Sequence, residues 1–439
     1  MNTVVIGIVT MLALSMARIN VVLSIIIGAI VAGINGGLGI ASTMDAFTLG
    51  LGGGASIALS YALLGSFAAA LAYSNAPSWL ASRVAQKLDK NTNAKEAKGK
   101  YTLLLGILLM AIASQNIIPV HIAFIPILIP PLLTAFGSMK LDRRAISCVL
   151  TFGLCATYMV VPFGFGNIYL NQVLSENLAT NGVFVEQHLL PLAMAIPVAG
   201  MLVGMLWAVF VSYRKPRIYR TIESKVITDS PQKLTKRTFL IVGSAVVLAL
   251  LIQIATESIL LGAIAGFLVM VISNVIPWHK ADDVFVEGVK MMAFAAFVMM
   301  AASGFGEVLR QTGDIPSFIN SITALLAGNK PLASFMMLVT GLLITMGLGS
   351  SFSTVPIIAA IFIPLATQMG FSPLAIAALI GTSAAMGDVG SPASESTIGP
   401  TMGLSIDGQH NHINDTVIPT FLHFSVPMLI CGWSATLIL

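Results

Sequence analysis

The residues best suited to chemistry in this chain form a polar stretch, 381–400, inside its most apolar third. It carries two carboxylates, Asp388 and Glu395, and no Lys or Arg occurs after Lys330. Irregular backbone at membrane depth must be buried in protein or line a cavity, because lipid offers no hydrogen bonds. A carboxylate there costs roughly 2.5–3.5 kcal/mol and usually marks an ion or solute path. The stretch therefore predicts a solute site, with further ligands Thr382, Ser383, Ser391, Ser394, Ser396 and Thr397.

Three more polar interruptions occupy matching places in the two halves of the chain. They cover 114–119 and 157–171 in the first half and 347–356 in the second. Broken segments that face each other bring helix ends together, and such ends can hold a carboxylate or a small cation. The alternative is a set of Pro and Gly kinks repaired by local hydroxyl bonds. The candidate ligands are Ser114, Gln115, Asn116, His121, Thr157, Asn167, Ser350, Ser351, Ser353 and Thr354.

Among the titratable residues, Asp388 is the first candidate for coupling. A carboxylate in a dry pocket can exchange a proton for a cation, because each stabilises a different charge state. The alternative for Asp388 is a helix-cap or turn aspartate, and for Glu395 a loop or cap residue. His121 could bind substrate or carry a proton, or it could be a hydrogen-bonded core histidine. Glu307 is expected to form an interfacial pair with Arg310.

The composition defines the class of protein. The chain has 439 residues, of which 56% are hydrophobic and 9% charged, and its mean hydropathy is +0.93. Soluble domains carry about 25% charged residues, so we expect an all-α polytopic membrane protein. At ~20 residues per span, the length accommodates about 12–14 segments. The net charge of +4 arises from short loops and gives no reason to expect a nucleic-acid partner.

The apolar runs and basic loops predict an orientation. Lys and Arg gather in 83–100, 140–144 and 213–237, and such loops stay in the cytoplasm. Both termini are then outside, in a multi-pass protein of the bacterial cytoplasmic (inner) membrane. The expected spans lie near 3–17, 19–36, 46–74, 101–117, 118–137, 145–161, 189–212, 238–256, 258–277, 283–309, 331–349, 353–369, 373–387 and 415–437.

The two halves resemble each other. Asp45–Gly50 aligns with Asp283–Gly288, and the same spacing pairs Phe67 with Phe305. Weaker matches join 118–126 to 355–364 and 153–167 to 381–397. The charge count gives the two copies opposite directions, which is a recurrent plan of secondary transporters. The expected organisation is N-terminal spans 1–44, a first repeat 45–212, a basic loop 213–237, linking spans 238–282 and a second repeat 283–439.

At Gly381–Pro400, and around Pro119 and Pro356, the chain resembles bacterial sodium/proton antiporter-family proteins of the ion-transporter superfamily. This resemblance implies a scaffold domain, a mobile transport domain with re-entrant hairpins, often a homodimer, and elevator-like alternating access. The branch that it most resembles includes proteins regarded as amino-acid carriers, with histidine among the proposed substrates. Where that superfamily carries a Ser-Asn-Thr-type signature, this chain has Ser114–Asn116 and Ser351–Thr354.

We therefore expect a secondary active transporter, driven by Na+ or H+, of a small organic solute. A site rich in hydroxyls and amides with few fixed charges suits a zwitterion such as an amino acid. The first alternative is a Na+/H+ antiporter that carries no organic substrate. An intramembrane enzyme is not expected, because it would need a convergent Ser/Lys, His/Glu or Asp/Asp pair. A channel is another alternative, but broken inverted repeats favour alternating access.

The expected partners are the lipid bilayer and the solute. No cofactor other than the coupling ion and no metal site are expected, and 407–412 is interpreted as a loop.

Overall fold

The computed structural model describes residues 2–17, 19–76, 79, 96–116, 125, 129, 132–219, 235–256, 258–314, 316–317, 321, 328–392 and 394–439. Regular structure in these ranges is helical throughout, which confirms the all-α class. Within them, four helices are long and apolar enough to cross a membrane, or five if one bent pair is a single span. Shorter apolar helices accompany them, so the expected 12–14 segments are not all full-length spans.

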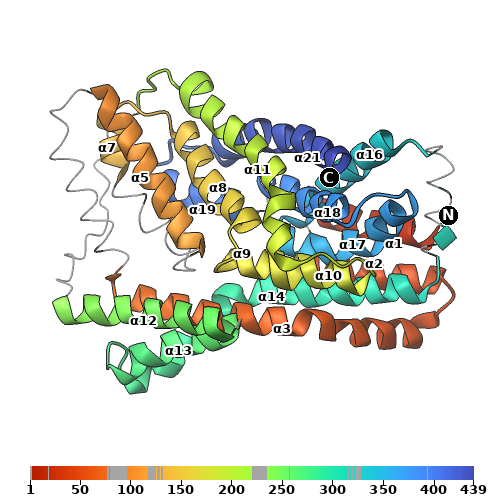
Figure 1. The fold of residues 1–439 in the computed structure, drawn as a ribbon. Helices are drawn as coiled ribbons and strands as arrows, with labels where there is room; N and C mark the ends of the chain where they lie inside the picture. Colours follow the sequence, from red (N-terminus) through yellow and green to blue (C-terminus); the bar gives the residue numbers. More distant parts are fainter. Residues whose placement is uncertain are drawn as a thin grey trace.

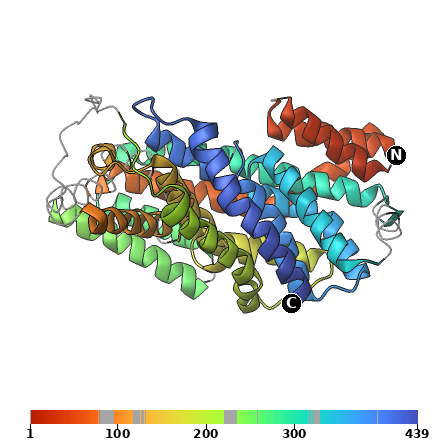
Figure 2. The same cartoon turned by 90° about the horizontal axis from the view of Figure 1, so that it is seen from above.

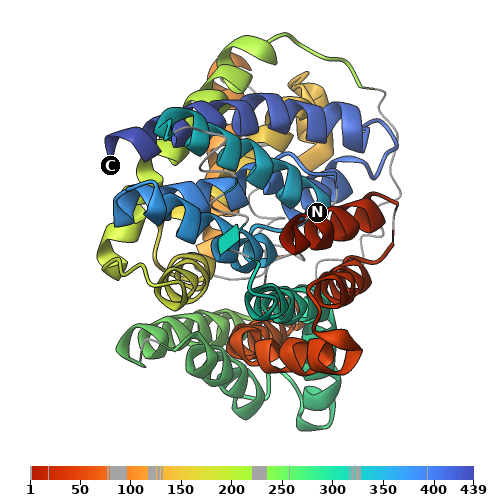
Figure 3. The same ribbon diagram turned by 90° about the vertical axis from the view of Figure 1, so that its right-hand side faces the viewer.

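The helices form two layers. One layer holds the two longest helices, α3 (Gly39–Tyr73) and α14 (Ala281–Gln311), together with α12 (Lys236–Thr256) and α13 (Ile259–Ile272). These four lie along the lower side of the molecule in two perpendicular views (Figures 1 and 3). The remaining long helices lie above them, and the polar stretch 381–400 belongs to that upper layer.

Glycines bring α3 and α14 together as an antiparallel pair. A Cβ atom on Gly65 would lie 2.3 Å from the carbonyl oxygen of Gly288, and one on Gly50 would lie 2.7 Å from that of Ser303. The Ser66 hydroxyl also donates to the Phe285 carbonyl at 3.0 Å. Small residues at such contacts let two backbones approach closely, as is common between membrane helices.

The N-terminal helices α1 (Thr3–Met16) and α2 (Val21–Asn35) form a pair at one edge of the molecule (Figure 2). They pack closely because a Cβ atom on Gly28 would lie 3.0 Å from the Gly7 carbonyl oxygen. At about 1.5 Å per residue each helix is only ~21–23 Å long, which is shorter than the ~30 Å hydrocarbon core. Asn20 begins α2 by accepting a hydrogen bond from the backbone of Val22.

In the upper layer, α16 (Lys330–Leu348) and α17 (Ser351–Gln368) form a helical hairpin. Gly349 makes the turn in the left-handed region with φ 71°, where glycine is favoured. The Lys330 ammonium donates to the Gly370 carbonyl at 2.7 Å, so the hairpin leaves and returns at the same end. The predicted interruption 347–356 contains this turn, but Pro356 does not break the chain there. The helix α17 continues through Pro356, which removes only one backbone donor.

Two helices of the upper layer are broken. The helix α8 (Arg143–Val160) bends by 52° into Phe165–Thr180, at a break where Gly164 has φ +60°. The helix α18 (Pro373–Asp388) ends inside the molecule, and α19 (Glu395–Leu404) continues after an irregular stretch. No span was expected between 161 and 189, but the structure shows helices there: α9 (Phe165–Asn167), η2 (Ile168–Leu174), α10 (Ser175–Thr180) and η3 (Gln187–Leu189).

The rest of the upper layer packs around these segments. It consists of α5 (Glu96–Asn116), α7 (Leu133–Ser138), α11 (Leu190–Trp207) with its extension η4 (Ala208–Ser212), and a final run of η6 (His412–Val417), α20 (Ile418–Thr420), η7 (Phe421–Ser425) and α21 (Val426–Ile438). A short turn, η5 (Trp278–Lys280), precedes α14.

The described parts of the three basic loops lie together. The Lys100 ammonium donates to the Arg214 carbonyl at 3.2 Å, and the Arg217 backbone donates to the Lys140 carbonyl at 3.1 Å. The two termini lie away from this end (Figure 1). The arrangement agrees with the expectation that the three basic loops share one side of the membrane.

Candidate functional site

The carboxylate of Asp388 lies at the centre of a buried cluster of hydroxyls. Its Oδ2 atom accepts hydrogen bonds from Ser351 at 2.6 Å and from Tyr158 at 2.9 Å. Its Oδ1 atom accepts from Ser394 and, at 3.2 Å, from Ser396. The residue is 7% exposed. These donors come from α8, the hairpin tip, the break after α18 and the start of α19. Asp388 therefore links four segments and is not only a helix-cap or turn aspartate.

Local geometry explains why these segments meet. A Cβ atom on Gly387 would lie 2.4 Å from that of Thr345 and 2.6 Å from the Met346 backbone nitrogen. Glycine at that position therefore lets the end of α18 approach α16 and the tip of the hairpin. On the other side, Ser394 caps α19 by accepting a hydrogen bond from the Ser396 backbone at 3.1 Å.

The groups that bond to the Asp388 carboxylate in the described ranges are all hydroxyls. No basic side chain in the described ranges bonds to Asp388, so hydroxyl dipoles alone stabilise its charge. A buried charge needs such partners, because loss of water is costly. Each hydroxyl has two lone pairs as well as its proton. The same five side chains can therefore surround a proton on Asp388 or offer carboxylate and hydroxyl oxygens to a hard cation, which prefers such ligands.

Aromatic rings lie beside the cluster. The Tyr158 ring lies 4.8 Å from that of Tyr169 and 5.3 Å from that of Phe352, measured between centroids. The Tyr169 hydroxyl donates to the Gly381 carbonyl at 2.7 Å, which fixes this ring against α18. Neither tyrosine was predicted as a site residue. The available signal was that Tyr158 follows Thr157 in the interruption aligned with 381–397.

Of the predicted ligands that the structure describes, Ser351, Ser394 and Ser396 bond to the Asp388 carboxylate. Several others donate to backbone carbonyls of nearby turns or neighbouring helices, as Ser and Thr commonly do in helices. Ser350 lies at the start of α17, where its carbonyl accepts two such bonds. The donors are Thr157 to Gly153, Ser353 and Thr354 to Ser350, Ser391 to Met346, and Thr397 to Ser391 and Ser394.

Thr382 and Ser383 lie at helix contacts and do not reach the carboxylate. A Cβ atom on Gly432 would lie 2.4 Å from Thr382 Cγ2, and one on Gly341 would lie 2.4 Å from Ser383 Cβ. Both hydroxyls are buried without a hydrogen-bond partner in the described part of the chain. Their small size permits α18 to pack against α16 and α21.

The end of α5 forms a separate polar region. Ser114 donates to the Ala111 carbonyl at 2.8 Å. Gln115 and Asn116 are buried, and their side-chain oxygens have no partner within the described ranges. Asn116 lies beside Gly164 at the break after α8, because a Cβ atom there would be 2.4 Å from the Asn116 carbonyl oxygen. Asn167 bonds to Asn171 at 2.5 Å, and His121 lies outside the described residues.

The other two carboxylates singled out by sequence behave differently from Asp388. Glu395 is exposed in the first turn of α19, where its charge complements the helix N-terminus. Glu307 pairs with Arg310 at 3.2 Å and accepts a hydrogen bond from Gln311 at 3.0 Å. The predicted Glu307–Arg310 pair is confirmed.

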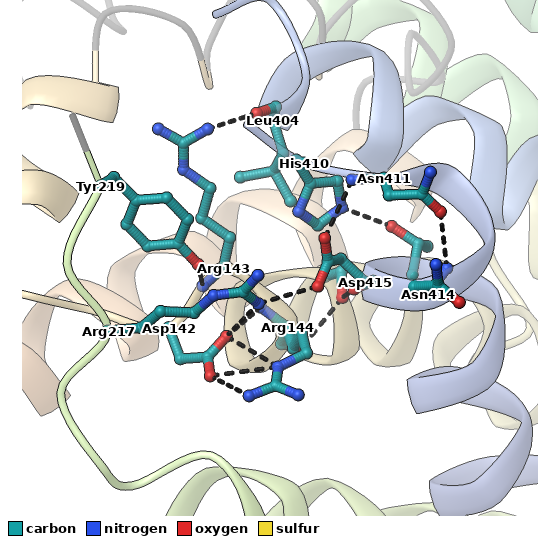
Figure 4. A network of polar contacts seen from close by, with 12 residues as sticks. Asp142, Arg143, Arg144, Arg217, Tyr219, Leu404, His410, Asn411, Asn414 and Asp415 are labelled. Carbon is teal, nitrogen blue, oxygen red and sulfur yellow. Dashed lines mark hydrogen bonds and ion pairs between the residues drawn. The ribbon is translucent and has the colours of Figure 1, made fainter. Parts of the chain in front are cut away.

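A charged network at the end of the basic loops holds α19 against α8 (Figure 4). The Arg143 guanidinium makes two parallel bonds to Asp407, at 2.6 and 2.5 Å, and donates to the Leu404 carbonyl at 2.9 Å. Its other face covers the Tyr219 ring at 4.3 Å. Arg143 is 2% exposed. We call the Arg143–Asp407 pair the clamp.

Titration near the clamp follows from burial and charge. Burial opposes ionisation of Asp407, but the hydrogen bonds and charge of Arg143 outweigh it and hold the pKa of Asp407 below its usual range. Burial lowers the pKa of His410 to about 4, and its imidazole bonds to the Thr416 hydroxyl at 2.7 Å. Within the described part of the chain, no group of three His, Cys, Asp or Glu residues could hold a metal ion.

A helical hairpin and broken helices around a buried, oxygen-lined carboxylate, within an apolar helical bundle, define the class of secondary membrane transporters. The chain belongs to the Na+/H+ antiporter family, whose profile matches residues 149–433. A second profile, described as a Na+-H+ antiporter family, matches residues 2–88. The expected family and the multi-pass membrane location are thereby confirmed.

Relatives match over the full chain. A membrane protein of Vibrio parahaemolyticus is 50% identical over 100% of both chains. A protein of Bacillus subtilis, named "Putative amino acid transporter YuiF", is 46% identical over 100% of both.

Two solved structures share the fold. MtrF of Neisseria gonorrhoeae, described as one of a class of antimetabolite efflux pumps, has a TM-score of 0.62 at 15% identity and covers 91% of this chain and 85% of its own. The YdaH transporter of Alcanivorax borkumensis has a TM-score of 0.56 at 17% identity and covers 90% and 87%. At these identities the similarity shows the fold alone.

Proposed function

We propose that this chain transports a small organic solute, an amino acid, coupled to a Na+ or H+ gradient at Asp388. The observation that carries the proposal is a buried carboxylate with four hydroxyl donors and no basic partner in the described ranges. An arginine partner would keep such a carboxylate charged and unavailable. Here the charge can be balanced by an ion that comes and goes.

The coupling step is an exchange at the carboxylate. With a proton on Asp388, the hydroxyls of Ser351 and Ser394 satisfy the remaining oxygen lone pairs. When the proton leaves, Na+ can take its place if these hydroxyls turn their own lone pairs inward. The two states differ in charge and in hydroxyl orientation, and the hydroxyls belong to segments on either side of the breaks. Occupancy of the site can therefore bias how these segments pack.

Two observations support an amino acid as the solute. A relative that is 46% identical over its full length bears the name of an amino acid transporter. Tyr158, which bonds to Asp388, packs its ring against those of Tyr169 and Phe352, and aromatic faces attract ammonium groups. The site thus offers oxygen and aromatic contacts with little fixed charge, which suits a zwitterion.

We also propose that the repeats 45–212 and 283–439 are related by an inverted twofold axis through α3 and α14. The spacing that aligns Asp45 with Asp283 also pairs Gly50 with Gly288 and Gly65 with Ser303. The structure has Gly65 against Gly288 and Gly50 against Ser303. Such reciprocal contacts are what a twofold axis requires, and antiparallel helices agree with inverted topology. This symmetry supports alternating access.

The proposal is tested by ligand-dependent thermal stability of the purified protein. A ligand that binds only the native state at 100 times its Kd stabilises it by about 2.7 kcal/mol. We expect Na+, or a change of pH, to raise the melting temperature of the wild type and of Glu395→Gln. Asp388→Asn should lose this response, and an equal Na+ response in that variant would contradict the proposal.

The family profile itself favours the second candidate, a Na+/H+ exchanger without an organic solute. The same measurement separates the two. Under the amino-acid proposal, one member of a set of amino acids adds a further shift that depends on Na+ or pH. Under the exchanger alternative, the ion response persists and no amino acid changes the melting temperature.

A further inference from the structure

A pocket of about 940 Å³ lies in the lower layer, far along the chain from Asp388. It is formed where three helix ends meet: the end of α3, the start of α12 and the end of α13. The lining includes Tyr73, Asn75, Arg237, Thr238 and Asn274. Arg237 is the last residue of the basic loop 213–237, so the pocket lies at the basic end of the protein.

The charge in this pocket is unbalanced. Arg237 is exposed and is the only charged residue among the described residues that line the pocket. It makes no ion pair within the described ranges. The other polar groups of the lining include amides and hydroxyls, of which Thr235 and Thr238 bond to each other at 2.7 Å. A guanidinium among neutral hydrogen-bonding groups suits a single phosphate.

The surroundings of the pocket are those of a membrane boundary. Lys236 begins a candidate membrane span, 236–253. Next to the pocket, Leu240 is 70% exposed on α12 and Ile272 is 79% exposed on α13. The Trp79 ring packs 5.3 Å from Phe239, and tryptophan is enriched at the level of lipid headgroups. A ligand with a phosphate in the pocket could lay its apolar part along these two helices.

We infer that this pocket binds the phosphate headgroup of an anionic phospholipid from the leaflet on the basic side. Arg237 holds the phosphate, the amides of Asn75 and Asn274 bond to the polar headgroup, and the acyl chains lie along Leu240 and Ile272. Basic pockets between membrane helices on the cytoplasmic side are general sites for acidic headgroups. The site lies between α3, α12 and α13, so a bound lipid would stabilise the packing of these three helices in the lower layer.

The test is native mass spectrometry of the purified, delipidated full-length protein with phosphatidylglycerol or phosphatidylethanolamine of the same acyl chains. The wild type should retain phosphatidylglycerol preferentially. Arg237→Gln should weaken that binding about tenfold, the scale expected for one charge-assisted contact. Arg237→Lys should restore part of the binding. The matched control is Lys236→Gln, the neighbouring exposed basic residue outside the pocket lining, which should stay within about twofold of wild type.

A second variant tests lipid binding independently, in case Arg237→Gln fails to fold. Asn274 has φ +60°, so Asn274→Gly keeps this backbone conformation while removing the amide, and it should also weaken lipid retention. Three results would each overturn the inference: wild-type retention in Arg237→Gln, equal losses in Lys236→Gln, or equal retention of the two lipids. Displacement of phosphatidylglycerol by inorganic phosphate would assign the pocket to free phosphate and overturn the lipid.

Discussion

At the residue scale, Asp388 differs from Asp407 and Asp415 because its partners are neutral. Asp407 and Asp415 each pair with an arginine, at 2.5 and 2.8 Å, and such pairs hold a fixed charge state. Asp388 instead accepts only hydroxyl donors, which can reorient without moving the backbone. A carboxylate in this setting is suited to a change of occupant, whereas Asp407 and Asp415 are suited to holding structure.

Removal of the Tyr158 hydroxyl tests the hydrogen bonding of the Asp388 cluster with the loss of one oxygen atom. Tyr158→Phe keeps the ring but removes one donor to Asp388. We expect Na+ affinity, measured by thermal shift, to change by about tenfold, the scale of one hydrogen bond to a charged group. Tyr169→Phe is the matched control, because its hydroxyl bonds to the Gly381 carbonyl and not to Asp388. Equal ion affinities in both variants would remove Tyr158 from the site.

Sequence alone predicted part of this site. Asp388, Ser351, Ser394 and Ser396 stood out because polar groups are rare in apolar surroundings. The same criterion also selected hydroxyls such as Thr354 that bond to their own helix, since local bonding and ligand binding use the same residue types. Tyr158 was missed because its ring is apolar and only the tertiary fold aims its hydroxyl at Asp388.

At the element scale, α19 links the site to the basic end of the protein. Ser396, which bonds to Asp388, lies in its first turn, and Asp407 of the clamp follows its last. The Thr151 hydroxyl of α8 also donates to the Ser396 carbonyl at 2.9 Å. A change at the carboxylate therefore acts on an element that is tied to α8 at both ends.

The clamp should stabilise the protein in a pH-dependent way. Because the folded pKa of Asp407 is lowered, its contribution is present above the unfolded value of about 3.9 and is lost as pH falls through the folded one. Asp407→Asn should lower the melting temperature at pH 7, and the difference from wild type should shrink below about pH 4. Glu186→Gln, in an exposed pair with His188, should leave it unchanged. A pH-independent difference would show that the charge of Asp407 is not what stabilises the clamp.

His410 should also make stability fall as pH falls, but over a higher pH range than Asp407. Its folded pKa is about 4, below the unfolded value of about 6.5. The unfolded state therefore binds a proton first, and wild-type stability should fall as pH decreases from about 6.5 towards 4. His410→Gln should reduce this slope in melting curves taken over that range. An unchanged slope would assign the loss of stability to other groups.

The elements themselves were predicted unevenly. Uninterrupted apolar runs, such as those of α2, α12 and α17, were found within a few residues. The helical segment 165–180 was missed, because Pro162 and Gly164 precede it and asparagines interrupt its apolar pattern. A broken span gives two apolar runs of half the usual length. Each run alone is too short to predict a membrane span, so it resembles a loop between spans.

At the scale of the whole molecule, the antiparallel pair α3–α14 runs the length of the lower layer beneath the site-bearing upper layer (Figure 1). Hydropathy could not predict this layering, because lipid-facing and protein-facing apolar residues look alike in sequence. The glycines at the contact carry the information, but only once the partner helix is known. If α3 and α14 belong to a scaffold, their contact must be tight.

The glycine contact should tolerate no added carbon. Gly65→Ala places a Cβ atom 2.3 Å from the Gly288 carbonyl oxygen, and such overpacking costs about 1–3 kcal/mol. Gly52→Ala is the control on the same helix, since nothing lies within 4 Å of its added carbon. It should be neutral or stabilise by about 0.5–1 kcal/mol. Equal melting temperatures for the two variants would contradict the close approach of α3 and α14.

The most direct test of the transport proposal is uptake by the purified protein in liposomes. A pooled set of labelled amino acids is supplied under an imposed Na+ or H+ gradient, with wild type and Asp388→Asn compared at equal reconstitution. We predict that one amino acid accumulates in wild-type vesicles only with the gradient, and that Asp388→Asn inserts and folds but transports at background. Sodium-driven proton movement without amino-acid uptake would contradict the organic solute. Wild-type uptake by Asp388→Asn would contradict the central role of this carboxylate.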